Sequence, residues 1–290
     1  QSFDSTWSDN DGDGMFDSHT SIGHLDIYLS RLTGKAAKIQ TYLDRVHDYK
    51  TNGPLLEPSM FIFIDDDWQD PYFGAINSTW GLESVYSTFV RMEDVWSTKG
   101  YRYLDFMGTE GAEYVYQWIH ASPTELYFIE DGDWYETVTL NEIVQNGAVG
   151  SFFNLFNCSA ARFTETNLAS TYLHRPYGLA TVGSTKAGGI FNPYPLHAKL
   201  VAGGNWGKGF VKWYEEEGRY DDSWFLGMGI QGDPTLVLSE DTRRSMQDAT
   251  PMPKLSQAQS DALMHSLLDG PGDRGGSFDE YQDAHPQFTD

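Results

Sequence analysis

Residues 148–158 run Ala-Val-Gly-Ser-Phe-Phe-Asn-Leu-Phe-Asn-Cys, and this stretch decides the predicted fold. A continuous apolar run of this length is typical of a strand that is buried on both faces of a parallel sheet. The run ends at Cys158, the single cysteine of the chain, so no internal disulfide can form. A lone cysteine is by default a small buried side chain, and a reactive thiol is the alternative.

Strand and helix signals alternate outward from this run. Apolar and β-rich stretches predict strands at residues 25–29, 60–64, 101–107, 114–119, 126–129, 179–183 and 235–238. Helical patterns predict helices at residues 35–49, with Thr33 as the N-cap, and at 82–98, 140–145, 167–174, 196–202 and 210–217. Apolar strands interleaved with helices predict an α/β fold with a mostly parallel sheet and helices on both faces.

Two residues that can act in catalysis directly follow predicted strands. His120 follows the strand at 114–119, and Cys158 ends the run described above. Functional residues of open α/β sheets gather beyond the carboxyl ends of the strands. About one β-loop-α-β unit separates the two residues, so adjacent parallel strands would bring them to the same edge. A histidine can take the proton of a thiol, which predicts a Cys-His dyad; a partly buried structural histidine is the alternative.

An acidic run follows the predicted strand at 60–64, and it contains Asp65, Asp66, Asp67 and Asp70. One of these carboxylates can orient His120 through its second ring nitrogen, as the third member of a catalytic triad does. Another can recognise a cationic side chain of a substrate. A solvated acidic loop or a cation site is the alternative interpretation.

A second acidic segment near the N-terminus has the pattern D-x-D-x-D-G-x-x-D. Calcium prefers six to eight oxygen ligands, which alternating Asp side chains around a glycine turn can supply. The predicted Ca²⁺ ligands are the side chains of Asp9, Asp11, Asp13 and Asp17 and the backbone carbonyl of Met15. Thr20 stands where an EF-hand loop has its bidentate Glu. We therefore expect an isolated structural calcium loop, with a solvated acidic turn as the alternative.

Composition narrows the class of protein. The formal net charge of −23 and the pI of about 4.5 disfavour binding to nucleic acid. No apolar run has the length of a membrane span. The chain begins with Gln1 and has no signal-peptide pattern, so we expect a processed product that is secreted or at the cell surface. Residues 1–240 form the predicted domain, and residues 241–290, rich in Asp, Gly, Pro, Gln and Ser, form a polar extension.

The order of these blocks resembles the gingipain-like cysteine peptidases, which belong with the caspases and clostripain in one structural clan. Two blocks carry the catalytic candidates: Tyr116-Gln117-Trp118-Ile119-His120-Ala121-Ser122, and residues 153–163, which include Asn157-Cys158-Ser159. The other similar blocks are residues 9–17 with 25–32, 35–49, 179–185 and 232–236. The resemblance therefore covers most of the chain, from about residue 9 to residue 238.

The resemblance implies a caspase-like three-layer α/β sandwich and a peptidase with a protein or peptide substrate. It implies that Cys158 attacks the scissile carbonyl, that His120 handles protons, and that the amides of Cys158 and Ala121 hold the oxyanion. An acidic residue after the strand at 60–64 would assist the histidine. Asp65 or Asp66 is the candidate, and Asp66 belongs to the predicted catalytic set. Members of the family often cleave after Arg or Lys, for which Asp67 and Asp70 are the candidate recognition residues.

The chain also departs from the family pattern. Ala121 stands where the family usually has Gly after the catalytic histidine, and the strands that normally precede the acidic loop are missing. A separate N-terminal fragment that completes the sheet, or a shortened variant, would account for the second departure. Three functions follow from these residues: an active endopeptidase, a catalytically retired calcium-stabilised binding module, and a sorting transpeptidase that uses the same dyad.

Overall fold

The computed structural model describes residues 6–12, 18–19, 24–68, 81–82, 85–130, 133–190, 192–218 and 227–238. Within them, seven strands form one sheet in the order β3-β12-β11-β10-β6-β4-β5. The strands are β3 (Ser30–Arg31), β4 (Met60–Ile64), β5 (Phe89–Met92), β6 (Ala112–Trp118), β10 (Gly150–Phe156), β11 (Ala180–Ser184) and β12 (Met228–Gly232). From β5 to β11 all neighbours are parallel, whereas β12 is antiparallel to β11 and parallel to β3. The chain is therefore α/β with a mostly parallel sheet.

Successive side chains of the central strands point alternately into two apolar cores, one on each face of the sheet. Met60, Ile62 and Ile64 of β4 face one core, whereas Phe61 and Phe63 face the other. Every residue of β4, β6 and β10 is buried, and each strand places apolar side chains in both cores. This explains why continuous apolar runs, rather than alternating ones, marked them in the sequence.

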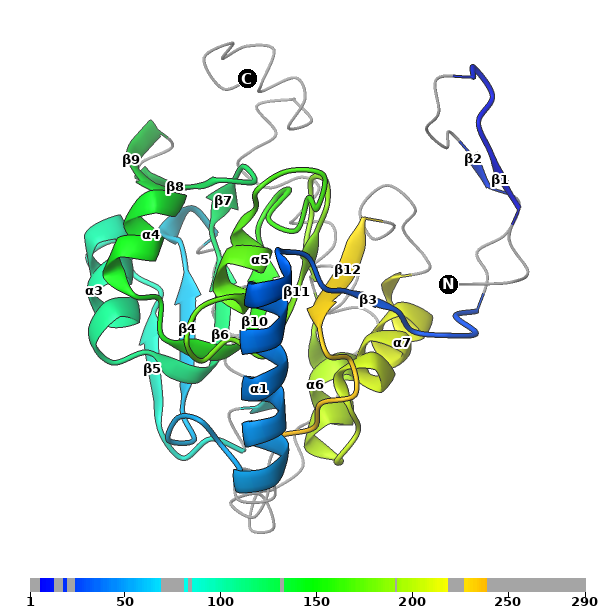
Figure 1. Ribbon diagram of the computed structural model, residues 1–290. Coiled ribbons are helices and arrows are strands. Elements are labelled where there is room, and N and C mark those ends of the chain that lie inside the picture. Colours follow the sequence, from blue (N-terminus) through cyan, green and yellow to red (C-terminus); the bar gives the residue numbers. More distant parts are fainter. Residues whose placement is uncertain are drawn as a thin grey trace.

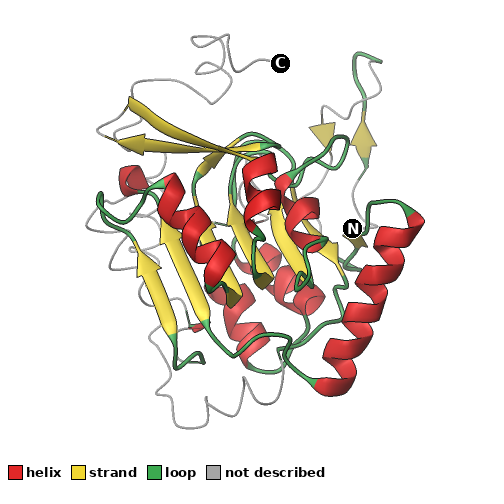
Figure 2. Ribbon diagram, turned by 60° about the vertical axis from the view of Figure 1, so that its left-hand side comes forward, coloured by secondary structure: helices red, strands yellow, loops and turns green. Residues whose placement is uncertain are grey.

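Helices cover both faces of the sheet and form the outer layers (Figures 1 and 2). The first core includes side chains of α1 (Ala36–Asn52), α6 (Tyr194–Val201) and α7 (Trp206–Glu216). The second includes side chains of α3 (Gly100–Thr109), α4 (Leu140–Asn146) and α5 (Leu168–Leu173). The sheet and its two helical faces thus make three layers.

Smaller elements lie beyond the carboxyl ends of the parallel strands. A three-stranded antiparallel sheet consists of β7 (His120–Ala121), β8 (Glu125–Glu130) and β9 (Asp133–Thr139). It lies at the edge toward which the arrows of β4 and β6 point (Figure 1). The short helix η1 (Asp66–Trp68) follows β4. At the N-terminal end, β1 (Trp7–Ser8) pairs with β2 (Ser18–His19).

Several predicted elements are wrong. Residues 101–107 form part of helix α3 instead of a strand, because Tyr103, Phe106 and Met107 lie at helical spacing and pack together in the second core. The stretch predicted as a helix at 82–98 contains strand β5. The last strand, β12, precedes the turn at Asp233 instead of following it. Helix α1 begins after Lys35, which makes no side-chain cap, and not after Thr33.

Two predictions concern the ends of the chain. Residues 241–290 lie outside the described residues, so the division at residue 240 stays a prediction. The seven strands of the sheet all lie within the described residues. An additional N-terminal fragment that would add strands to this sheet also stays a prediction. Over the described ranges, no helix has both the length and the apolarity to cross a bilayer.

Candidate active site

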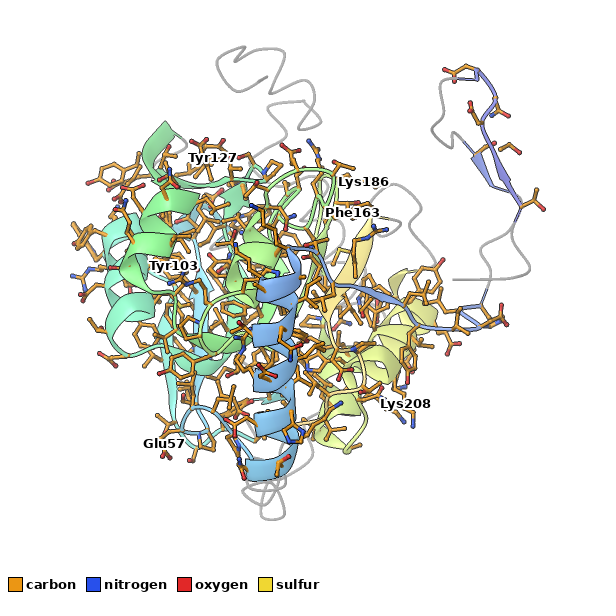
Figure 3. All side chains as sticks on the ribbon, viewed as in Figure 1. Glu57, Tyr103, Tyr127, Phe163, Lys186 and Lys208 are labelled. Carbon is orange, nitrogen blue, oxygen red and sulfur yellow. The ribbon has the colours of Figure 1, made fainter. Side chains whose placement is uncertain are left out.

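Adjacent strand ends bring His120 and Cys158 to the same edge of the sheet. In the parallel pair of β6 and β10, Trp118 lies opposite Phe156, and each candidate lies two residues further along. The Ile119 amide donates to the Phe156 carbonyl over 3.3 Å, which continues the pairing past both strands. The same edge carries Tyr127, as Figure 3 shows.

His120 is held on two sides. Its Nε2 lies 2.7 Å from Oδ2 of Asp67, and its ring stacks on Trp68 with the centroids 4.9 Å apart and the planes at 27°. Trp68 also makes edge contacts with Trp118 and Phe156, so the stack is part of the first core. Because Nε2 is bound to the carboxylate, Nδ1 is the ring nitrogen that can accept a proton from a thiol.

The carboxylate that contacts His120 is Asp67 and not Asp66, which was the predicted assisting residue. Asp66 accepts a hydrogen bond from Thr98 Oγ1 at 2.9 Å. Asp65 accepts from the amides of Asp66 and Ile129 at 3.2 and 3.0 Å. Successive side chains of a 3₁₀ turn point about 120° apart, so only one of them faces the histidine.

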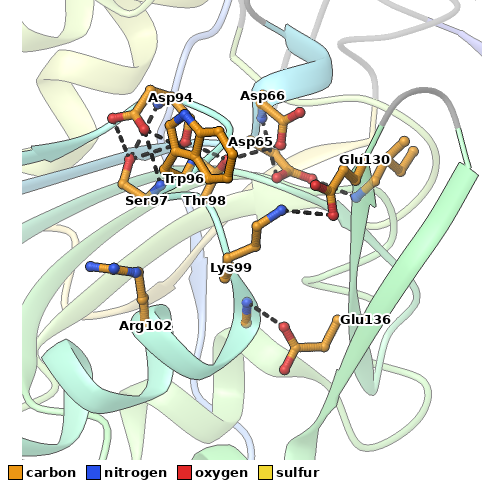
Figure 4. A network of polar contacts seen from close by, with 12 residues as sticks. Asp65, Asp66, Asp94, Trp96, Ser97, Thr98, Lys99, Arg102, Glu130 and Glu136 are labelled. Atoms are coloured by element: carbon orange, nitrogen blue, oxygen red, sulfur yellow. Dashed lines mark hydrogen bonds and ion pairs between the residues drawn. The ribbon is translucent and has the colours of Figure 1, made fainter.

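The neighbouring carboxyl groups carry structural contacts around this edge (Figure 4). Asp66 ties η1 to the segment before α3 through Thr98. Next to it, Lys99 forms an ion pair with Glu130 of β8 at 2.9 Å, and its ammonium lies 4.4 Å from the ring centroid of Tyr135. These contacts connect the ends of β4 and β5 with the small sheet, and they hold the turn that presents Asp67.

Asp65 lies fully buried directly after β4. Burial raises the pKa of Asp65, and the charge of Asp67 raises it further, against the opposing effect of the Ile129 amide. Asp65 therefore joins β4 to β8, while Asp67 is the side chain that pairs with His120.

Cys158 lies in the turn after β10, and burial raises the pKa of its thiol. The amides of Gly188 and of Cys158 itself oppose this shift by hydrogen bonding to the sulfur. Among the described contacts, no hydrogen bond joins the Cys158 and His120 side chains. The resting thiol is therefore neutral, and proton transfer requires the two side chains to approach, as catalytic pairs often do once substrate is bound.

The turn after Cys158 is backbone-strained at Ser159, whose φ is +56°. The Ser159 amide donates to the Lys186 carbonyl at 2.8 Å, and its hydroxyl accepts from Arg162 Nη2 at 2.8 Å. These bonds hold an unfavourable conformation directly after the candidate nucleophile. Sequence reasoning missed it, because Ser carries no signal for positive φ. Phe163 and Lys186 of the same region are labelled in Figure 3.

Two backbone amides, those of Ala121 and Cys158, are the predicted oxyanion donors. Ser122 donates to Glu125 at 3.0 Å, and Ala121 lies opposite Leu126. Alternation in an antiparallel ladder therefore turns the Ala121 N–H away from β8. Ala121 is not among the described non-glycine residues with positive φ, so its backbone accommodates a Cβ and does not need glycine. The other predicted donor is the amide of Cys158, which hydrogen-bonds to its own sulfur in this structure.

The predicted calcium loop is described only in part. Asp9 and Asp11 lie in a turn where the Gly12 amide donates to Asp9 Oδ1 at 2.7 Å, and pairing of β1 with β2 closes the loop. Asp13, Met15 and Asp17 lie outside the described residues, as does Asp70. Within the described part of the chain, no three or more His, Cys, Asp or Glu side chains are clustered for a metal. The calcium site stays a prediction.

No known protein-family model matches the chain, and no curated protein is significantly similar to it. A functional assignment therefore depends on the residues and geometry of the chain itself. The site combines a thiol with a carboxylate-bound histidine, and covalent acyl transfer requires these two groups together with donors for the oxyanion.

Proposed function

We propose that this chain is a secreted cysteine endopeptidase with a caspase-like fold, similar to the gingipain-like peptidases. Cys158 is the nucleophile and His120 its base. The observation that supports this most strongly is that His120, bound to Asp67, and Cys158 each lie two residues past the paired ends of adjacent parallel strands. The strand-end position, the acidic partner and the strained turn at Ser159 occur together at one edge of the sheet.

In the first half of the reaction, His120 takes the proton of the Cys158 thiol. The thiolate attacks the scissile carbonyl carbon, and the amides of Cys158 and Ala121 stabilise the negative oxygen. The protonated His120 then donates its proton to the leaving amine as the C–N bond breaks. Asp67 stabilises the imidazolium through this step. The products are a thioester on Cys158 and a free amine.

In the second half, His120 takes a proton from water, and the resulting nucleophile attacks the thioester carbonyl. The C–S bond breaks, and the proton on His120 returns to the departing sulfur of Cys158. The stacked ring of Trp68 favours the cationic form of His120, because an aromatic face attracts a cation. The acid product then leaves the site.

A preference for Arg or Lys before the scissile bond is also proposed. Oδ2 of Asp67 is already bound to His120, which leaves Oδ1 for a basic substrate side chain. Asp70 is the remaining candidate from the acidic run for a basic side chain. We further propose that Ca²⁺ binds residues 9–17, where the carboxylates and the Met15 carbonyl would supply hard oxygen ligands, and that it stabilises the fold.

A catalytically retired binding module is the second candidate. Two observations favour it: the raised pKa of the partly exposed Cys158 thiol, and the lack, among the described contacts, of a direct hydrogen bond between Cys158 and His120. A sorting transpeptidase would have the same dyad and would differ in passing the thioester to an amine.

The test is the digestion of a denatured protein mixture in the presence of calcium, with cleavage sites identified by mass spectrometry. We expect cleavage that Cys158→Ala and His120→Ala abolish and that His47→Ala, a change at an exposed histidine, leaves intact. The residue before each cleavage site identifies the preferred side chain. An added amine that becomes joined to the new carboxyl ends would identify a transpeptidase. Absence of cleavage by the folded protein contradicts both enzymatic functions.

A further inference from the structure

A single buried side chain connects the backbone on either side of the candidate dyad. Asn157, between β10 and Cys158, is 1% exposed. Its Nδ2 donates to the carbonyl of Ile119 at 2.5 Å, and Ile119 directly precedes His120. Its Oδ1 accepts from Gln117 Nε2 of β6 at 2.8 Å. The residue before the nucleophile is therefore bound to the residue before the base.

The contact continues into the helices of the second core. Gln117 Oε1 accepts from the Tyr103 hydroxyl of α3 at 2.7 Å, and that hydroxyl lies 2.7 Å from the Tyr172 hydroxyl of α5. All four side chains of this chain of hydrogen bonds are buried. Burial raises the pKa of both tyrosines, so the network consists of neutral groups. Buried networks with every member satisfied are rigid.

We infer that Asn157 is a positioning residue that sets the separation of Cys158 and His120, an inference that rests on the proposed function. If the alternation of β6 and β10 continues past their ends, Asn157 lies on one face, and Cys158 and His120 lie on the other. The contacts of Trp68 with Trp118, Phe156 and His120 fit this arrangement. The carboxamide can bridge the strands without entering the space between the reacting side chains.

The bridge needs the donor and the acceptor of a carboxamide at once. Leucine has a similar volume and makes neither bond. Aspartate keeps the acceptor for Gln117, but it donates to the Ile119 carbonyl only when it is protonated. Asn154 of β10 offers a matched control, because it is a fully buried amide three residues before Asn157 and lies 3.5 Å from His197 instead of contacting the dyad region.

The experiment measures the rate at which 2,2′-dipyridyl disulfide modifies the single cysteine, from about pH 4 to pH 9, in the full chain with calcium. This readout follows thiol activation and needs no substrate. Asn157→Leu is compared with the unsubstituted protein, with His120→Ala and with Asn154→Leu, each checked for folding by circular dichroism. We expect Asn157→Leu to slow the reaction at neutral pH about tenfold or more and to move its pH profile toward that of His120→Ala. Asn154→Leu leaves the profile unchanged.

Asn157→Asp covers the case in which Asn157→Leu does not fold. Relative to the unsubstituted protein, its defect should shrink at acid pH, where a protonated carboxyl group can donate to Ile119 again. A role in packing alone would not produce this dependence. If His120→Ala shifts the profile but the folded Asn157 variants do not, the inference is overturned and the proposed dyad stands. If His120→Ala also leaves the profile unchanged, both the dyad and the positioning role are overturned.

Discussion

His197 and His120 both lie among aromatic side chains, and the comparison between them shows what distinguishes a structural residue from a candidate base. His197 of α6 is fully buried, and its Nε2 lies 2.7 Å from the Tyr114 hydroxyl. His120 is 22% exposed at the strand edge, and its Nε2 lies 2.7 Å from Asp67. Burial raises the pKa of Tyr114, so the partner of His197 is neutral. A carboxylate partner instead favours an imidazolium, which proton transfer from a thiol generates.

Alanine at each of the two histidines should separate their roles with the largest effect. We expect His120→Ala to lower peptide hydrolysis by about 10²–10⁴-fold, because general base catalysis is lost. The same change should alter the free energy of unfolding by only about 1 kcal/mol. His197→Ala should cost about 3 kcal/mol of stability, because it leaves a cavity and an unpaired buried hydroxyl on Tyr114. Hydrolysis rates and urea unfolding measure the two effects. Equal loss of stability in both variants would remove the distinction.

A second test asks which carboxylate matters to His120. Asp67→Asn removes the charge beside Nε2 and should lower kcat/KM by about 10²-fold, because the ring is no longer held in the reactive orientation. Asp66→Asn is the matched control, since the amide oxygen can still accept from Thr98. It should stay within about twofold of the unsubstituted protein. A larger loss in Asp66→Asn than in Asp67→Asn would return the assisting role to Asp66.

The stacked indole should have a smaller effect. Trp68→Leu keeps apolar volume but removes the ring face beneath His120. An aromatic face is worth about 0.5–2 kcal/mol to a cation, so kcat/KM should fall about 2- to 30-fold. Trp96→Leu controls for the loss of a tryptophan, because Trp96 is 78% exposed. Comparable losses from both variants would show that the stack has no role in the reaction.

A further prediction concerns stability instead of activity, through its dependence on pH. Because the pKa of Asp65 is raised in the folded state, its stabilising contribution is complete below the pKa of the unfolded carboxyl and is lost as pH rises toward the folded value. The melting temperature of the unsubstituted protein should therefore fall relative to that of Asp65→Asn between about pH 5 and pH 8. If the melting temperatures of the two proteins instead change in parallel across this pH range, Asp65 is ionised in the folded state.

Much of the sheet could be predicted because its central strands are apolar on both faces. Met60–Ile64 was located to the residue, and β6 and β10 were located to within about two residues. Residues 101–107 were predicted as a strand because aromatic residues favour strands in isolation. In the structure their helical spacing packs one face of α3 against Phe61 and Phe63. Tertiary packing therefore decided α3 against local preference.

The candidate site was predictable where a strand end defines it and not where a turn does. His120 and Cys158 could be found from their places after apolar strands. Asp67 could not be separated from Asp66, because one residue in a 3₁₀ turn changes the direction of a side chain. Asn157 carried a weak signal, as an amide that ends an apolar run.

The most direct test of the central claim is the labelling of Cys158 by peptide acyloxymethyl ketones, followed by intact-mass spectrometry with calcium present. The probes carry Arg, Lys, Asp or Leu next to the reactive group. The account predicts one label per chain, absent from Cys158→Ala and strongly reduced in His120→Ala, while His197→Ala keeps labelling at a temperature where it is folded. Labelling that proceeds equally without His120, or no labelling of the folded protein, would contradict the assignment of a catalytic dyad.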